Sequence, residues 1–395
     1  VRIILEAIYE PIFMDTSHGF RPNRSCHTAL QSVKYEFRGA RWFIEGDIKG
    51  CFDNINHNVL ISCINKKIKD ARFTKLIYKF LKAGFVDDFV YNNTYSGCAQ
   101  GGIISPILAN IYLHELDKFV ENLSKEFNEP ATEKFTADYR KAQNAMAVTR
   151  KKIKKAENAD DEVEKAELLK VYKSQRATLL KTPCKSQTDK KLKYVRYADD
   201  CMIFCKSRKS AERTLKNIIP FIEKKLFLKV NRKKTEVAHI SKVKYLGYTF
   251  YRYKGKCRFR VHQKSVAKMK NRIRELTDRN KGISNAEREK KYQEYVRGWV
   301  EYFRLADMKK LLQKTDEWAR RRIRAVYWKQ WKKIKTKCRM LKALGLEDWK
   351  AKELANSRKG YWRMAKVLNQ IFSNKIIAKL GYTSMLDYYL VVYEN

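Results

Sequence analysis

The sequence predicts an α+β fold with an antiparallel sheet, followed by an all-helical C-terminal part. Two regions indicate strands. In residues 194–204, apolar and polar side chains alternate, and the apolar pattern repeats after a short interruption. Residues 244–253 predict another strand, which a turn at 254–256 joins to a returning strand. From about residue 263 onward the apolar spacing is helical almost throughout. We therefore expect strands and helices to alternate in the first part of the chain and helices to fill the second.

Two helices and an insertion are predicted within the first part. Ser105 and Pro106 indicate a helix start, and the apolar stripe that follows is Ile107, Leu108, Ile111, Leu116, Phe119 and Val120. Residues 121–192 are rich in Lys and Glu, which predicts an inserted, solvent-exposed helical arm; its charges fit a solvated face and RNA contact equally well. Residues 211–226 predict a helix kinked at Pro220.

Composition indicates a polyanionic partner. The chain of 395 residues carries 86 Lys and Arg against 43 Asp and Glu, a formal charge of +43, which points to nucleic acid. A membrane surface is the alternative, but no stretch of 18 apolar residues occurs. The nine cysteines are scattered without a C-x-x-C pair, which is typical of reduced thiols in a cytoplasmic protein, and the length implies two or three domains.

Adjacent carboxylates interrupt the run 194–204 and indicate a metal site. They belong to YADD at 197–200, and the strand pattern on both sides predicts that Asp199 and Asp200 lie at the tip of a hairpin. Two negative charges so close raise each other's pKa unless a cation neutralises them, and ligation by oxygen alone suits magnesium. The competing interpretation is a turn with solvated acids.

A second segment should contribute a carboxylate, because two-metal phosphoryl transfer takes ligands from more than one segment. Asp47 is the best candidate, since it ends the apolar stretch 42–44 and stands five residues before Phe52. Neighbouring strand residues point to opposite faces. We therefore expect Asp199 and Asp47 to form the shared pair, with Asp200 in a supporting role.

Six motifs occur along the chain in one order: HGFRPNRS at 18–25, D-x-x-x-x-F at 47–52, QGGIISP at 100–106, YADD at 197–200, N-x-x-K-T at 231–235 and YLGY at 245–248. This order resembles reverse transcriptases. QGGIISP followed by ILANIYLHELD is similar to the enzymes of bacterial group II introns, also called maturases, although Ala99 stands where that family commonly has proline. The resemblance covers nearly the whole chain.

The resemblance implies a right-hand polymerase architecture. Residues 1–262 would form the fingers and palm, with the N-terminal fingers incomplete, residues 263–335 the thumb or maturase X domain, and residues 336–395 a DNA-binding domain. The paired cysteines and clustered histidines of a zinc-supported endonuclease are missing, which predicts an endonuclease-lacking member. The expected location is the bacterial cytoplasm, in association with the nucleoid.

The resemblance also implies a reaction, in which a primer 3′-hydroxyl attacks the α-phosphate of a deoxynucleoside triphosphate (dNTP) paired to an RNA template. Two Mg²⁺ ions, with Mn²⁺ as a substitute, would be held by Asp47, Asp199 and Asp200 and by the backbone carbonyl of Ile48. Lys234 of N-x-x-K-T would protonate the pyrophosphate. RNA-directed DNA synthesis of this kind would accompany help with intron splicing and mobility (retrohoming).

The motifs imply further contacts with nucleotides and nucleic acid. Phe52 would stack under the sugar and exclude a 2′-hydroxyl, unless it is simply a buried aromatic residue. Glycines in QGGIISP would let the backbone approach the nascent pair. The expected nucleotide-binding residues are Phe52, Arg21, Gln100 and Gly101, and the expected primer, template and RNA contacts are Asn23, Arg24, Gly102, Tyr245, Leu246 and Gly247.

The C-terminal part combines tryptophans with cations. Six of the seven tryptophans fall between Trp299 and Trp362, among a dense basic run, which is typical of a nucleic-acid surface. A helical bundle with tryptophan in its core is the other interpretation, and both can hold. Apolar spacing at Trp318, Ile323 and Val326 predicts one packed face, which leaves the arginines to the other. The predicted RNA contacts here are Arg320, Arg321 and Arg324, with Arg358 and Lys359 in SRKGYWR.

Two functions remain open at this point. One is an active polymerase whose partners are group II intron RNA, an RNA template, a DNA primer or target and dNTPs, without a membrane. The other is an RNA-binding splicing cofactor without polymerase activity. The intact acids Asp47, Asp199 and Asp200 favour the polymerase. The sequence leaves a homodimer open.

Overall fold

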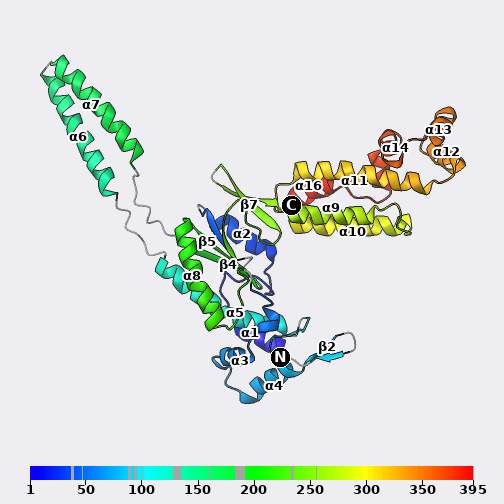
Figure 1. The fold of residues 1–395 in the computed structure, drawn as a ribbon, viewed down its shortest axis with the longest axis horizontal. Helices are drawn as coiled ribbons and strands as arrows, with labels where there is room; N and C mark the ends of the chain where they lie inside the picture. Colours follow the sequence, from blue (N-terminus) through cyan, green and yellow to red (C-terminus); the bar gives the residue numbers. More distant parts are fainter. Residues whose placement is uncertain are drawn as a thin grey trace. The chain divides into compact units, whose positions relative to one another are not determined.

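The protein has two compact units, Val1–His239 and Ile240–Asn395, in a computed structural model (Figure 1). The structure describes residues 1–36, 40–46, 48–87, 90–92, 96–99, 101–127, 135–159, 161–182, 192–232, 235–254 and 256–394. The predicted boundaries at 262 and 335 remain a prediction about domains. By packing, the hairpin 248–261 belongs with the C-terminal unit.

A four-stranded antiparallel sheet forms the centre of the first unit. Its strand order is β4 (Leu192–Tyr197), β5 (Asp200–Cys205), β1 (Trp42–Gly46) and β6 (Glu236–His239). Each neighbouring pair is antiparallel, so the predicted α+β class with an antiparallel sheet is confirmed. The alternating run 194–204 supplies most of β4 and most of β5, which pair as a hairpin.

Two long helices cover this sheet and bury its apolar side chains. Helix α8 (Arg208–Lys224) packs on β1 and β5, and α5 (Ser105–Phe127) packs on β4. The predicted stripe of α5 is buried at Ile107, Leu108, Ile111, Leu116 and Val120. Helix α8 begins three residues before the predicted position, because the Ser207 side chain accepts from the Ser210 amide and caps it.

Shorter elements complete the first unit. Helix α1 packs on α5, and α3 packs on both α4 and α5. Their bounds are α1 (Arg2–Tyr9), α2 (Cys26–Glu36), a 3₁₀ turn η1 (Phe52–Asn54), α3 (His57–Asn65), α4 (Ala71–Lys82), β2 (Phe85–Asp87) and β3 (Val90–Asn92). Strands β2 and β3 pair with each other.

Two helices lie within the predicted arm, although α5 continues to Phe127 and thus past the predicted start at residue 121. Helices α6 (Ala137–Asn158) and α7 (Glu162–Lys181) lie side by side (Figure 1). Thr149, Ile153 and Ala156 of α6 are buried, whereas most other described residues of the pair are exposed. Contact between this arm and RNA remains a prediction.

The C-terminal unit opens with a hairpin of β7 (Tyr248–Tyr253) and β8 (Lys256–Val261). The predicted strand starts at residue 244, but β7 starts four residues later. Leu246 and Gly247 have φ of 49° and 79°, and the chain turns so that the Tyr245 amide donates to the Tyr248 carbonyl at 3.0 Å. This turn occupies the residues that the pattern assigned to a strand.

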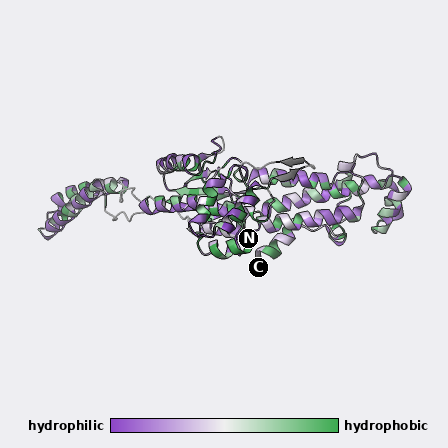
Figure 2. Ribbon diagram, turned by 90° about the horizontal axis from the view of Figure 1, so that it is seen from below, coloured by the Kyte–Doolittle hydropathy of each residue, from purple (hydrophilic) through white to green (hydrophobic). Residues whose placement is uncertain are grey.

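Helices make up the rest of the chain, as predicted. They are α9 (Gln263–Leu276), α10 (Asn285–Phe303), α11 (Lys309–Gln330), α12 (Ile334–Ala343), α13 (Asp348–Ala355), α14 (Tyr361–Val367), α15 (Asn374–Lys379) and α16 (Met385–Glu394). Hydrophilic and hydrophobic residues share these helices (Figure 2). Trp299, Trp328 and Trp331 are buried. Among the helices that the structure describes, none is long and apolar enough to cross a membrane.

Asp316 of α11 joins two helices of this unit. Its buried carboxylate accepts hydrogen bonds from the amides of Met385 and Leu386 and from the Ser384 hydroxyl, at 2.8 to 3.0 Å. These amides lie in the first turn of α16 and have no partner within their own helix.

We expect Asp316→Ala to lower the free energy of unfolding by about 2 kcal/mol, because it removes this cap. Urea denaturation measures the change. Asp387→Ala, which removes an exposed acid from the first turn of α16, is the control and should change stability by only a few tenths of a kcal/mol. Equal losses in the two variants would contradict a capping role.

Candidate active site

The YADD motif forms the tight turn between β4 and β5. Tyr197 pairs with Asp200, so Ala198 and Asp199 occupy the tip. Ala198 has a φ of 56°, a left-handed conformation that costs energy for a residue with a Cβ. The Arg196 guanidinium donates to the Ala198 carbonyl at 2.8 Å and helps to hold this conformation. The prediction that the acids lie at a hairpin tip is confirmed for Asp199, whereas Asp200 is the first residue of β5.

Arg196 anchors the turn through a buried ion pair. Its Nη2 and Nε donate to the two oxygens of Asp117 in α5, at 2.6 and 2.8 Å, and both side chains are fully buried. Burial alone would lower the pKa of Arg196, but the Asp117 charge raises it above its usual value. The pair remains charged, and it links the strand before the turn to the central helix.

Neutral groups complete the hydrogen bonds of this pair. Tyr194 donates to Asp117 at 2.8 Å, while Arg196 donates to Asn110 Oδ1 at 3.0 Å and to Ser17 Oγ at 2.7 Å. A buried charge pair is tolerated when its remaining donors and acceptors are satisfied in this way.

The segment HGFRPNRS runs beside the end of β4. The His18 amide donates to the Arg196 carbonyl at 2.8 Å, and Asn110 donates to the Gly19 carbonyl at 2.8 Å. A Cβ on Gly19 would lie only 2.1 Å from the Ala198 amide nitrogen. Glycine is therefore required for the backbones of this segment and of the YADD turn to touch.

Two aromatic rings lie beside these segments. Phe20 is half exposed with a φ of 57°, and its ring meets that of Phe52 edge to face at 6.2 Å. The Phe52 carbonyl accepts from the Cys98 amide at 2.7 Å. The structure thus brings together parts of HGFRPNRS, D-x-x-x-x-F, YADD and the loop before α5.

Asp47, Gln100 and Lys234 lie outside the described residues, but segments next to Asp47 are described. Gly46 pairs with Cys201, directly after the YADD acids. Burial, and then the charge of Asp199, raise the pKa of the Cys51 thiol to about 12. The pairing of β1 with β5 therefore places the YADD turn beside the end of β1.

The donor atoms here suit a hard cation. Asp199 and Asp200 supply carboxylate oxygens, and Ile48 follows Asp47 on the adjacent segment; magnesium binds such oxygen donors. Among the described residues, no group of three His, Cys, Asp or Glu side chains is close enough to hold a metal ion. The third carboxylate of the predicted set belongs to Asp47.

The two glycines before α5 are needed for two different structural reasons. Gly101 has a φ of 84° and a Cβ there would meet nothing within 4 Å, so its backbone is accessible. A Cβ on Gly102 would lie 2.6 Å from Ser105 Oγ, which itself donates to the Ala99 carbonyl. Gly101 allows the turn, and Gly102 allows its close packing.

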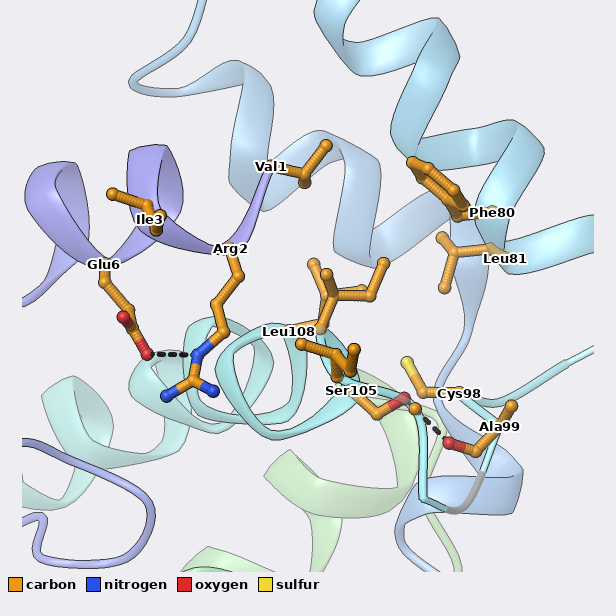
Figure 3. A pocket seen from close by; sticks show the side chains of 13 residues that line it. Val1, Arg2, Ile3, Glu6, Phe80, Leu81, Cys98, Ala99, Ser105 and Leu108 are labelled. Atoms are coloured by element: carbon orange, nitrogen blue, oxygen red, sulfur yellow. Dashed lines mark hydrogen bonds and ion pairs between the residues drawn. The ribbon is translucent and has the colours of Figure 1, made fainter.

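An apolar pocket of about 740 Å³ borders this loop (Figure 3). Its walls come from α1, from α4 and from the start of α5, and Arg2 pairs with Glu6 at its edge. The lining residues that carry larger apolar side chains are Val1, Ile3, Phe80, Leu81, Ile103, Ile104 and Leu108. Gly102 also lines the pocket.

Arg21 lies inside the protein, contrary to the prediction that it contacts a nucleotide. It is 8% exposed, pairs with Glu10 at 2.8 Å and donates to the carbonyls of Met14 and Ser17. These contacts hold the loop that precedes HGFRPNRS. Arg24 pairs with Asp15 at 2.5 Å and Asn23 is exposed, so both remain near the surface.

The YLGY turn is held by its own unit. Tyr302 donates to the Leu246 carbonyl at 3.0 Å and Ser265 donates to the Gly247 carbonyl at 3.1 Å, whereas Tyr245 is buried. A Cβ on Gly247 would lie 3.1 Å from the Phe303 ring. The turn therefore presents Leu246 and Gly247 in one fixed conformation.

The arginines of α11 do not share one exposed face. Arg324 is buried and donates to the Phe372 carbonyl at 2.8 Å and to Asn374, and burial lowers its pKa to about 10. The prediction that Arg324 projects toward RNA was wrong, because its position on α11 faces the packed segment 372–374. Arg320 and Arg321 are partly exposed, and Arg358 and Lys359 are exposed.

Comparison with known families agrees with this arrangement. Residues 1–139 and 170–250 match the reverse transcriptase (RNA-dependent DNA polymerase) family, and residues 266–345 match the group II intron maturase-specific domain. This chain is a reverse transcriptase family member with a group II intron maturase domain. The reverse transcriptase match omits residues 140–169, a range that includes most of α6 and the start of α7.

The chain is similar to a group II intron-encoded protein and to a protein in a cob intron. The chain is 53% identical over 250 residues to the group II intron-encoded protein LtrA of Lactococcus lactis subsp. cremoris, covering 63% of this chain and 41% of LtrA. It is 42% identical over 253 residues to an uncharacterized 91 kDa protein in a cob intron of Schizosaccharomyces pombe, covering 62% and 30%. The chain thus spans less than half the length of these relatives.

Among solved structures, apo telomerase from Candida tropicalis matches with a TM-score of 0.40 and 11% identity. The match covers 98% of this chain and 58% of that chain.

Arg196, Asp117 and Phe20 are residues of the candidate site that sequence reasoning missed. Arg196 stands inside a strand pattern, and Asp117 stands inside the apolar stripe of a predicted helix. Charges at such positions are rarely buried unless they are paired, so each predicts a partner. The sequence around Phe20 does not predict its role, because the ring is half exposed as a result of the positive φ of this residue.

We expect Asp117→Ala to lower the free energy of unfolding by about 3 to 5 kcal/mol, since Arg196 would remain buried without its counter-charge. Denaturant unfolding followed by circular dichroism measures the loss. Glu121→Ala is the control on the same helix, because it breaks only an exposed pair with Lys125 and should cost less than about 1 kcal/mol. A loss as small as that of the control would contradict the anchoring role.

His18 should make stability depend on pH. Burial, and then the charges of Arg24 and Arg21, lower its pKa from 6.5 to about 4. Between pH 6.5 and pH 4 the unfolded chain is therefore protonated at His18 and the folded chain is not. The free energy of unfolding falls as the pH drops from about 6.5 to about 4, by at most about 3 kcal/mol.

The variant His18→Gln should flatten this part of the stability profile. Unfolding free energies at pH 7 and pH 4.5 for the two proteins give the comparison, because the carboxylates that titrate in the same range are common to both. An identical slope in the variant would assign the pH dependence to other groups.

Proposed function

We propose that the protein is an RNA-directed DNA polymerase of a group II intron, which also assists intron splicing and mobility. The observation that carries the proposal is a chain of contacts that links three separated motifs, together with the loop before α5, beside the Ala198–Asp199 turn. Gly19 touches this turn, Phe52 lies with Phe20, and Cys98 bonds to the Phe52 carbonyl. A strained carboxylate turn held by a buried ion pair is a costly arrangement that packing alone does not require.

The carboxylates would hold the cations of the reaction. Asp199 and Asp47, with Asp200 and the Ile48 carbonyl in support, would bind two Mg²⁺ ions, for which Mn²⁺ can substitute. When bound, these ions would neutralise phosphate charge and lower the pKa of the primer 3′-hydroxyl. The chain's own task is to keep the donor oxygens fixed, which Arg196 does by holding the turn.

Other residues would orient the primer, the template and the dNTP. Phe52 would lie under the sugar, with Phe20 restricting the movement of its ring. The open backbone of Gly101 and the neighbouring Gln100 would approach the nascent pair, and Lys234 would protonate pyrophosphate. The proposed nucleic-acid contacts are Asn23, Arg24, Gly102, Leu246 and Gly247, whereas the buried Tyr245 would support the YLGY turn from within its unit.

Binding of intron RNA would use broad basic surface. The formal charge of +43 supports this role, and so do the exposed cations Arg358 and Lys359 and the partly exposed Arg320 and Arg321. The proposed partners are intron RNA, an RNA template, a DNA primer or target and dNTPs. Splicing assistance would come from binding energy that favours the folded intron.

Catalysis and splicing assistance should separate in Asp199→Asn. We expect primer extension on an RNA template to fall by at least about a hundred-fold, because the change removes a ligand charge from the metal site. Splicing of the intron RNA at low Mg²⁺ should continue, since a carboxylate adds no attraction to phosphate. Both assays are run on the same preparation.

Asp138→Asn, at an exposed acid of α6, is the control and should leave both activities unchanged. Extension at the wild-type rate in Asp199→Asn would refute the metal role. If the wild-type protein promotes splicing but extends no primer, the protein is a splicing cofactor without polymerase activity. Parallel loss of both activities in Asp199→Asn would mean that they share one site.

A further inference from the structure

A small pocket of about 250 Å³ lies in the C-terminal unit, where the turn after α9 meets α11 and α14. Helix α11 packs against both of these neighbours (Figure 1). The lining residues are Thr277, Asp278, Arg279, Arg322, Ala325 and Trp362. None of the functions assigned above uses this pocket.

The pocket has an excess of positive charge. Two arginines and one acid line it, and a third arginine, Arg274, accepts a hydrogen bond from Arg322 at its backbone carbonyl. Burial, and then the charges of Arg274 and Arg279, lower the pKa of Arg322 below its usual value, while Asp278 opposes this only in part. Arginines forced together in this way create a potential that favours an anion.

Arg322 is held in place before any ligand arrives. Its Nε donates to Thr277 Oγ1 at 2.7 Å, and its Nη2 donates to the carbonyls of Arg274 and Thr277 at 3.2 and 3.3 Å. The buried Arg288 donates to the carbonyls of Leu276 and Asp278, each at 3.0 Å, and so fixes the turn. Little side-chain freedom would be lost on binding.

Aromatic rings flank the charges. The Arg321 guanidinium lies 4.0 Å over the ring of Trp362, and Arg279 lies 5.0 Å over the ring of Tyr361. Both rings remain about two-fifths exposed, at 42% and 41%. A free phosphate ion would require only the charges, whereas a nucleic-acid strand uses charges and exposed aromatic surface together.

We propose that this pocket binds a phosphodiester group of the group II intron RNA, with the guanidinium groups of Arg279 and Arg322 donating to its oxygens. All of the lining residues except Trp362 lie within 266–345, the range that matches the maturase-specific domain. The planar fork of arginine suits phosphate oxygens. The inference rests on the proposed binding of intron RNA and adds a defined site to it.

The test compares two exposed arginines that each lie over a tyrosine ring. Arg279 lies over Tyr361 in the pocket, and Arg297 lies over Tyr388, at 5.9 Å, outside it. Arg279→Gln and Arg297→Gln in the full chain remove the same charge. The probe is a single-stranded RNA oligonucleotide, and its affinity is measured over a range of salt concentrations.

We expect Arg279→Gln to weaken RNA binding about ten-fold, because one charge-assisted contact is lost. The slope of log affinity against log salt should fall by about 0.7, the value for one phosphate of a single strand. Arg297→Gln should change the affinity far less and leave the slope unchanged. Arg322→Gln should weaken binding as Arg279→Gln does, provided that melting shows it to be folded.

Two results would overturn the proposal. In the first, the wild type binds RNA but Arg279→Gln has the same RNA affinity and salt dependence as Arg297→Gln. This result would reject the pocket assignment and leave the proposed function intact. The other is a loss that persists on a methylphosphonate strand, whose backbone carries no charge, because Arg279 would then act on something other than phosphate. If the wild type binds no RNA, the pocket assignment and the proposed function fail together.

Discussion

The buried pair of Arg196 and Asp117 is the constraint on which the rest of the candidate site depends. It joins the strand that leads into the YADD turn to the long helix α5, and the same guanidinium holds the Ala198 carbonyl and the Ser17 hydroxyl. Because an unpaired charge here would be costly, the three segments can only assemble together. The position of Asp199 is thus set by a contact that it does not itself make.

Backbone strain and close backbone approach concentrate around this pair. Phe20, Asn23 and Ala198 all have positive φ although none is glycine, and Gly19 leaves no room for a Cβ beside Ala198. Such conformations cost energy and persist only where surrounding contacts determine them. Here they place a carboxylate turn beside two aromatic rings, and the proposed nucleotidyl transfer rests on this arrangement.

The arginines that contribute to the excess positive charge have different structural roles. Some arginines are internal supports: Arg21 and Arg288 hold loop carbonyls, and Arg324 fixes the segment after α14. Others are held against aromatic rings at the surface, as Arg321 is on Trp362. Counting cations therefore predicts a nucleic-acid partner but not which cations meet it, since burial depends on packing between segments far apart in the sequence.

The sequence by itself determined the strand hairpin that carries YADD, the helices that cover it, the helical arm and the reverse transcriptase family, because periodicity and motif order are local signals. Only the tertiary structure decided the partners of Arg196, the inward direction of Arg21 and Arg324, and the start of β7 at Tyr248. These depend on contacts that span 11 residues for Arg21, 48 for Arg324 and 79 for Arg196, or on a positive φ at Leu246, which no local pattern encodes. The sequence alone does not distinguish a charged side chain that faces water from one that donates to a carbonyl in the core.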